Sequence, residues 1–182
     1  MTLLAAREST ITEDGTTDWA ELRRRRRALA ALREALKVPD LPPEVVSVYR
    51  PTAPELADRI VTRILREVTA FATADPFVRS ALTEAINRAV MHFVDVLANV
   101  PWTGPDVYDF FRRIGNLQGA AGQDLDAMRA AHHIATQESW DDLRRVSIDL
   151  NLPAETMARL GDTLFAYQRQ LLDQAIVGFV VA

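Results

Sequence analysis

DLDAMRAAHHIATQESWDDLRRVSIDL, residues 124–150, decides the fold of this chain. Apolar or small residues return every three or four positions through it, which is the spacing of one face of an α-helix. The stripe contains Leu125, Met128, His132, Ala135, Ser139, Leu143, Val146 and Leu150. Similar spacing runs through most of the chain, whereas the period-two alternation of strands is almost absent. The sequence therefore predicts an all-α fold.

The same periodicity divides the chain into an arm and a core. Residues 1–17 are small and polar and predict a flexible N-terminus. Residues 18–37 predict an arm helix that begins at Asp18. Four prolines within residues 38–52 predict an extended linker, because proline disfavours the helical conformation. Residues 53–182 predict one helical domain, a single bundle of about five core helices, whose helices begin near 52, 75, 103, 124 and 153.

Bulk composition narrows the function classes. The chain has 182 residues, of which 48% are hydrophobic, and a net charge of −4, which makes its own nucleic-acid surface improbable. Cysteine is absent, which excludes disulfides and thiolate chemistry. No signal peptide and no apolar run of membrane-spanning length is visible, so we expect a cytoplasmic protein. Frequent alanine and arginine, with Lys37 as the one lysine, are typical of a high-GC bacterium.

Five consecutive arginines, residues 23–27, form the strongest local charge signal. Consecutive helical residues advance by about 100°, so the run surrounds the helix and does not make one basic face. Residues 1–50 hold nine basic and eight acidic residues, a smaller imbalance than nucleic-acid arms show. We interpret the run as a solvated part of an amphipathic helix.

Motifs for catalysis and metal binding are absent. The chain lacks H-E-x-x-H, phosphate-binding glycine loops and G-x-S-x-G, and no glutamate stands three residues before any of its histidines. His132 and His133 point about 100° apart on one helix, so they cannot bind one ion together. The sequence therefore predicts no catalytic residue, metal site or cofactor. A single axial histidine for haem stays open, because spacing does not test it.

His132 and the residues around it are the best sensing candidates. His132 lies on the apolar stripe and is expected to face the core or a cavity beside it, with Met128 one turn before it. His133 lies beside the stripe, on the face of Trp140. Three interpretations of His132 stay open: a core histidine bonded to a carbonyl or water, a ligand-binding or proton-sensing group, or a haem or metal ligand.

Glycines concentrate just before this helix. The segment GNLQGAAGQD contains Gly115, Gly119 and Gly122, and such a cluster predicts a hinge. A signal at the cavity would then shift the packing around the hinge.

Four segments resemble the all-helical N-terminal sensing domain of PucR/CdaR-type bacterial transcription regulators, which is related to the N-terminal domain of RsbR-type stressosome co-antagonists. They are ELADRIVTRILREVTAF, ALTEAINRAVMHFVDVL, IGNLQGAAGQDLDAMRAAHHIATQESWDDL and LPAETMARLGDTLFAYQRQLLDQAIVGF. The likeness is one of spacing and residue class over roughly 130 residues. One departure falls on the candidate site: family members often carry Tyr-Arg and a glycine where this chain has His132-His133 and Ala135.

The resemblance implies a non-enzymatic regulatory role. Such a module is expected to form a homodimer and to sense a signal such as a small-molecule effector. The last helix would carry the signal to an output domain, DNA is read outside this chain, and no membrane is contacted. One alternative is a ligand-free interaction scaffold of the stressosome kind, which predicts a solid core at His132. A haem- or metal-binding helical protein is the remaining alternative.

Overall fold

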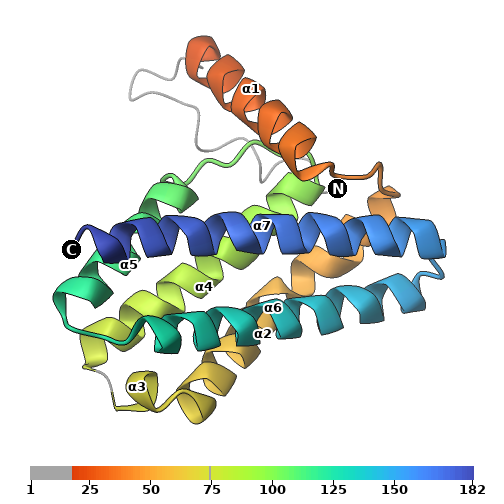
Figure 1. The fold of residues 1–182 in the computed structure, drawn as a ribbon. Helices are drawn as coiled ribbons and strands as arrows, with labels where there is room; N and C mark the ends of the chain where they lie inside the picture. Colours follow the sequence, from red (N-terminus) through yellow and green to blue (C-terminus); the bar gives the residue numbers. More distant parts are fainter. Residues whose placement is uncertain (1–17, 74) are drawn as a thin grey trace.

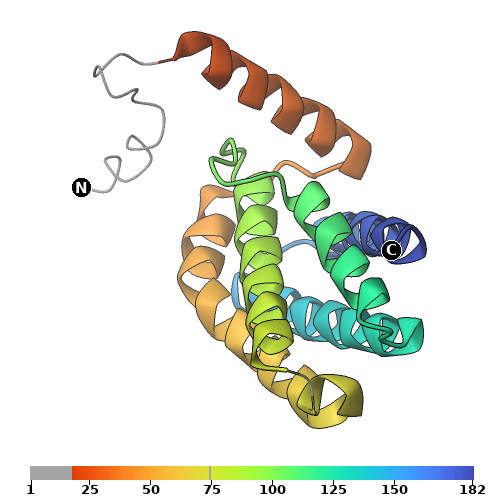
Figure 2. The same ribbon diagram turned by 90° about the vertical axis from the view of Figure 1, so that its left-hand side faces the viewer.

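The computed structural model describes residues 18–73 and 75–182, and these form helices without a strand. The helices are α1 (Trp19–Leu36), α2 (Pro43–Glu67), α3 (Thr69–Ala72), α4 (Pro76–Leu97), α5 (Val107–Ala120), α6 (Leu125–Asp149) and α7 (Ala154–Val180). The five long helices α2, α4, α5, α6 and α7 build one bundle, and α1 lies across one end of it (Figures 1 and 2). The predicted all-α bundle with an arm helix is confirmed.

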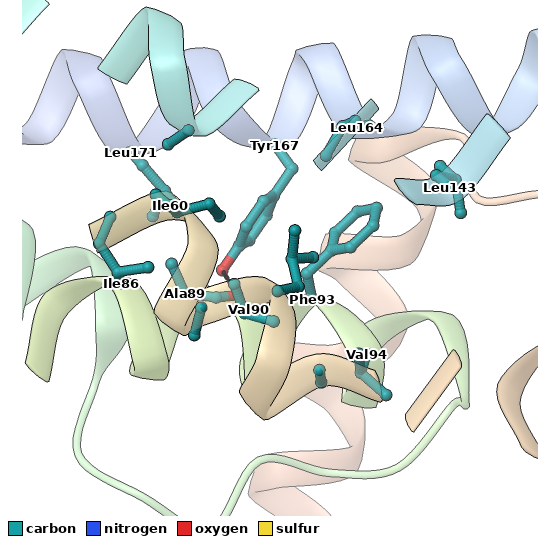
Figure 3. Packing of buried hydrophobic residues seen from close by; sticks show 14 of the residues in the cluster. Ile60, Ile86, Ala89, Val90, Phe93, Val94, Leu143, Leu164, Tyr167 and Leu171 are labelled. Atoms are coloured by element: carbon teal, nitrogen blue, oxygen red, sulfur yellow. Dashed lines mark hydrogen bonds between the residues drawn. The ribbon is translucent and has the colours of Figure 1, made fainter. Parts of the chain in front are cut away.

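α7 is the central element of the packing. It contacts α5 along most of its C-terminal half and α6 beside it, while α2 packs against α4 and α6 (Figure 1). Tyr167 reaches from α7 toward α4, where its hydroxyl donates to the carbonyl of Ala89 at 3.1 Å (Figure 3). Leu164 and Leu171 flank it on the same face of α7 and are almost fully buried. Burying such large side chains is the main favourable term in folding.

Aspartates begin most of the helices. Asp18, Asp75 and Asp124 accept hydrogen bonds from backbone amides of the first turns of α1, α4 and α6, as the sequence predicts. The predicted start near Thr103 is wrong, because α5 is capped by Asp106, whose carboxylate accepts from the amide of Asp109 at 2.8 Å. Pro105 lies between the two positions and disfavours helix for the residue before it.

The predicted extended linker over residues 38–52 is wrong for most of its length. α2 begins at Pro43, where proline suits the first turn, and continues through Pro51 and Pro54. Both internal prolines are exposed, so the carbonyls that lose a partner face water. Val45 and Tyr49 are buried on the opposite face, and each contributes about 1.5–3 kcal/mol, which outweighs the local preference. The division of the chain into domains stays a prediction, and residues 1–17 lie outside the described part.

The arm helix α1 is attached by a few specific contacts. Leu29 and Leu36 are buried against the bundle. Arg33 donates to the carbonyls of Val96 and Leu97 at the end of α4. Of the five consecutive arginines, Arg25 is half-buried and the other four are exposed. None of the helices in residues 18–73 and 75–182 is long and apolar enough to cross a membrane.

Candidate functional site

An apolar cavity of about 60 Å³ lies in the middle of the bundle. Every helix except α1 contributes to its wall, and most of the lining side chains are aliphatic or aromatic. Four polar side chains interrupt this lining: Gln118 from α5, His132 and Ser139 from α6, and Gln168 from α7. Polar side chains from three helices therefore line one space inside the core.

The sequence of α6 explains its share of the wall. Met128, His132, Ala135 and Ser139 follow one another at four, three and four residues, so they lie on one helical face and all line the cavity. Ala135 and Ser139 are small, and this leaves the space that larger side chains would fill. The predicted inward orientation of His132 agrees with this geometry.

The four polar side chains have no hydrogen-bond partner among the described residues. The side-chain hydrogen bonds of residues 18–73 and 75–182 include none from Gln118, His132, Ser139 or Gln168. No fully enclosed side-chain nitrogen or oxygen in that part of the chain is unpaired, so the polar atoms of these four keep some accessible surface, and all four residues line the cavity. An unpaired buried polar group costs about 1–3 kcal/mol. Water or a ligand in the cavity would remove that cost.

Burial controls the charge of His132. Removal of the imidazole from water lowers its pKa to about 4, the nearby Asp173 opposes this shift, and His133 adds to it. The ring is therefore neutral near pH 7 and offers one N–H donor and one acceptor nitrogen. A neutral ring with both functions suits hydrogen bonding to a polar ligand and does not suit proton sensing near neutrality.

The other residues of the predicted site separate. Met128 lines the cavity beside His132. His133 is exposed on another face of α6, where its Nε2 lies 2.9 Å from Nε2 of Gln137. Trp140 packs between α6 and α7, with its ring centroid 5.8 Å from that of Phe165. Two of the four predicted residues thus share the cavity.

The glycines do not form the predicted hinge as a unit. Gly115 and Gly119 lie inside α5 and face α7, and a Cβ on Gly115 would stand 1.8 Å from the carbonyl oxygen of Ala175. Gly178 of α7 approaches the carbonyl of Arg112 equally closely. These glycines therefore allow two helix backbones to touch. Gly122 alone of the predicted three lies in the turn after α5, where its φ of +66° favours glycine.

Sequence reasoning missed Gln118 and Gln168. Each is a lone polar residue on an otherwise apolar stripe, Gln118 one turn after Ile114 and Gln168 one turn after Leu164. That interruption was the available signal. Sequence reasoning also missed a buried polar pair formed by His92 of α4 and Tyr167 of α7, in which Nδ1 of the histidine lies 2.9 Å from the tyrosine hydroxyl.

Metal binding has little support in the described residues. No group of three or more histidine, cysteine, aspartate or glutamate side chains lies close enough there to hold an ion. Two aspartates in this region have structural roles: Asp124 caps α6, and Asp142 is buried between Arg59 and Arg145.

Comparison with known proteins gives one match. The family model described as the PucR-like N-terminal domain matches residues 38–182. Neither the curated proteins nor the solved structures give a significant match. The matched region contains α2 to α7 and therefore the whole wall of the cavity, whereas α1 lies before it.

Proposed function

The chain belongs to the PucR-like N-terminal domain family, which makes it a regulatory domain of a transcription regulator, and we propose that it senses a small-molecule signal at the central cavity. The observation that carries this proposal is that one apolar space is lined by Gln118, His132, Ser139 and Gln168, whose side chains have no hydrogen-bond partner in residues 18–73 and 75–182. Specific ligand sites combine an apolar wall with a few convergent polar groups. The role is regulatory and not catalytic, and it is exercised in the cytoplasm.

The size of the cavity sets the kind of response. At about 60 Å³ it holds water or a compound of very few atoms, because pockets for larger ligands start at about 300 Å³. A larger effector would have to separate the helices. α7 would then move together with α5, because the two backbones are in direct contact at Gly115 and Gly178. We propose that this paired movement is the signal, with DNA contact supplied outside this chain.

The experiment compares two variants of the same helix. Ala135→Leu places three extra carbons in the cavity, and Ala130→Leu places them on the exposed face of α6. Each purified protein is incubated with a metabolite extract and washed, and the retained compounds are identified by mass spectrometry. We expect the wild type and Ala130→Leu to retain a compound that Ala135→Leu does not. Identical retention by all three folded proteins would refute sensing at this cavity.

A ligand-free scaffold is the second candidate. The cavity at His132 departs from the solid core expected of a scaffold, but its volume of about 60 Å³ is below that of a small-molecule pocket. Under this hypothesis the four polar side chains bind only trapped water, and no compound is retained by the wild type. The same experiment therefore separates the two functions.

We also propose that the domain forms a homodimer. α7 exposes Phe165, Val177 and Val180, which are 48%, 49% and 72% accessible. Exposed apolar groups of this kind often mark an interface. Light scattering after gel filtration measures the molar mass of the protein in solution. We expect Phe165→Glu to lower this mass from that of a dimer toward that of a monomer.

A further inference from the structure

A second pocket of about 380 Å³ lies beneath the arm helix. Glu21, Arg24 and Arg25 of α1 form one side, and the opposite side is formed by His92, Trp102 and Tyr108. Figure 2 shows α1 lying over this end of the bundle. The volume falls within the range of small-molecule sites. This pocket is separate from the central cavity, and α1 lies outside the region that the family model matches.

The hydrogen bonds of Tyr167 fix the proton on His92. The hydroxyl of Tyr167 has one hydrogen, and the carbonyl of Ala89, 3.1 Å away, can only accept it. Nδ1 of His92, 2.9 Å from the same hydroxyl oxygen, must therefore be the donor in their contact. In a neutral imidazole the other nitrogen is then an acceptor. Burial lowers the pKa of His92 to about 4, so the ring is neutral near pH 7.

The acceptor nitrogen is the free polar group of the pocket. His92 is 7% exposed, and its Nε2 has no partner among the described residues. Since no enclosed side-chain nitrogen there is unpaired, Nε2 keeps some accessible surface, and His92 is part of the lining of this pocket. The donors of the neighbouring aromatic side chains are already used: Nε1 of Trp102 donates to the carbonyl of Pro105 at 2.8 Å, and the hydroxyl of Tyr108 donates to Gln170 at 2.9 Å. A ligand must therefore bring its own donor.

The charges of the pocket balance. Glu21 pairs with Arg24 at 2.7 Å and with Arg25 at 2.6 Å. Asp106 is engaged as the cap of α5, and the four charged side chains sum to zero. Both carboxylates are therefore bonded to groups of the protein, and the pocket presents no net charge to a ligand. An uncharged molecule fits this arrangement best.

The remaining wall is apolar: aliphatic side chains line most of it, and three aromatic rings form a cluster on the side of the bundle. The ring of His92 stands edge-to-face with Trp102, with centroids 5.5 Å apart, and with Tyr108, with centroids 6.1 Å apart. Aromatic rings pack favourably on one another in this geometry, beyond the area that they bury. A flat aromatic ligand would extend the cluster under the arginines of α1.

We propose that this pocket binds an uncharged aromatic molecule carrying a hydroxyl or N–H group, which donates to Nε2 of His92 while α1 closes over its ring. Phenol and indole are the simplest members of this class. The proposal is independent of sensing at the central cavity.

The first test compares phenol with toluene, which has the same shape and no donor. Each is titrated into the full chain, and the ring nitrogens of His92 are followed by long-range ¹H–¹⁵N NMR. We expect phenol to bind roughly five- to tenfold more tightly, the value of one hydrogen bond, and to shift Nε2. In His92→Phe, which keeps an aromatic ring, the two probes should bind equally. Equal affinity in the wild type, or no shift of Nε2, would overturn the proposal.

A second test avoids the buried network, in case His92→Phe does not fold. Ala28 lines the pocket from α1, and Ala31 is exposed on the same helix and does not line it. Ala28→Leu should weaken phenol binding at least tenfold, whereas Ala31→Leu should leave it unchanged. An equal effect of both substitutions, or of neither, would place phenol elsewhere and refute the site.

Discussion

The contact between α5 and α7 gives the sharpest test of the structure, through Gly115→Ala. In an unhindered helix interior this change is stabilising by about 0.5–1 kcal/mol, because alanine has the higher helix propensity. Here the new methyl group would stand 1.8 Å from the carbonyl oxygen of Ala175, well inside van der Waals contact. The obstacle is backbone, so no change of rotamer can relieve it.

The expected magnitude follows from what must move. Ordinary contact begins at about 3.4 Å, so one helix would have to retreat by more than an ångström. Close-packed interiors do not yield by that amount without loss of packing. Added atoms in such cores cost about 1–3 kcal/mol and sometimes more. We therefore expect Gly115→Ala to lower the free energy of unfolding by about 3 kcal/mol, which reverses the sign expected from helix propensity.

Urea unfolding followed by circular dichroism measures this change, with the slope of the transition as the check on two-state behaviour. Gly122→Ala is the control: nothing lies within 4 Å of its added methyl, and its φ of +66° predicts a loss of only about 1 kcal/mol. A Gly115→Ala protein as stable as the wild type would show that the two backbones do not touch, and the mechanism proposed for α7 would fail with it.

Three further predictions concern buried polar groups. Tyr167→Phe leaves the Nδ1 hydrogen of His92 unpaired and should lower the free energy of unfolding by about 1–3 kcal/mol in urea. Asp142→Asn, at a 3% exposed site bonded to Arg59, should cost about 1–3 kcal/mol, whereas the exposed Asp141→Asn should cost less than about 0.5 kcal/mol. The free energy of unfolding should fall as the pH drops from about 6.5 to 4, because the unfolded chain takes up protons on His92 and His132 that the folded chain does not. The loss should reach up to about 3 kcal/mol for each of these histidines, whose pKa is near 4 in the folded protein. A stability that does not change with pH over this range would contradict their burial.

Local periodicity was enough to predict α6 and the inward direction of His132. Both depend on spacing along one helix, and the aspartate at position 124 marks its start. The beginning of α2 was not predictable in this way. Four prolines argue for extended chain, and the burial that overrides them, at Val45 and Tyr49, depends on helices far away in the sequence.

The full set of residues that line the cavity could not be predicted either, because it depends on contacts between helices that are far apart in the sequence. Gln118 and Gln168 are 50 positions apart and line the same cavity only because α5 packs along α7, so neither could be assigned to a site without the packing. The glycine cluster was recognised, but the close approach of two backbones at Gly115 was not predicted. Flexibility and close approach both require glycine, and only the carbonyl of Ala175 facing Gly115 distinguishes them.

The two proposed sites share one helix. Tyr167 bonds to His92 at the wall of the pocket beneath α1, and its neighbour Gln168 faces the central cavity. Ala89, which accepts the hydrogen bond of Tyr167, also lines that cavity. A ligand that holds His92 therefore restrains the same turns of α7 that a ligand in the cavity would displace. Because coupling between binding sites is reciprocal, any change that the effector makes in phenol affinity must appear as an equal change in effector affinity with phenol bound.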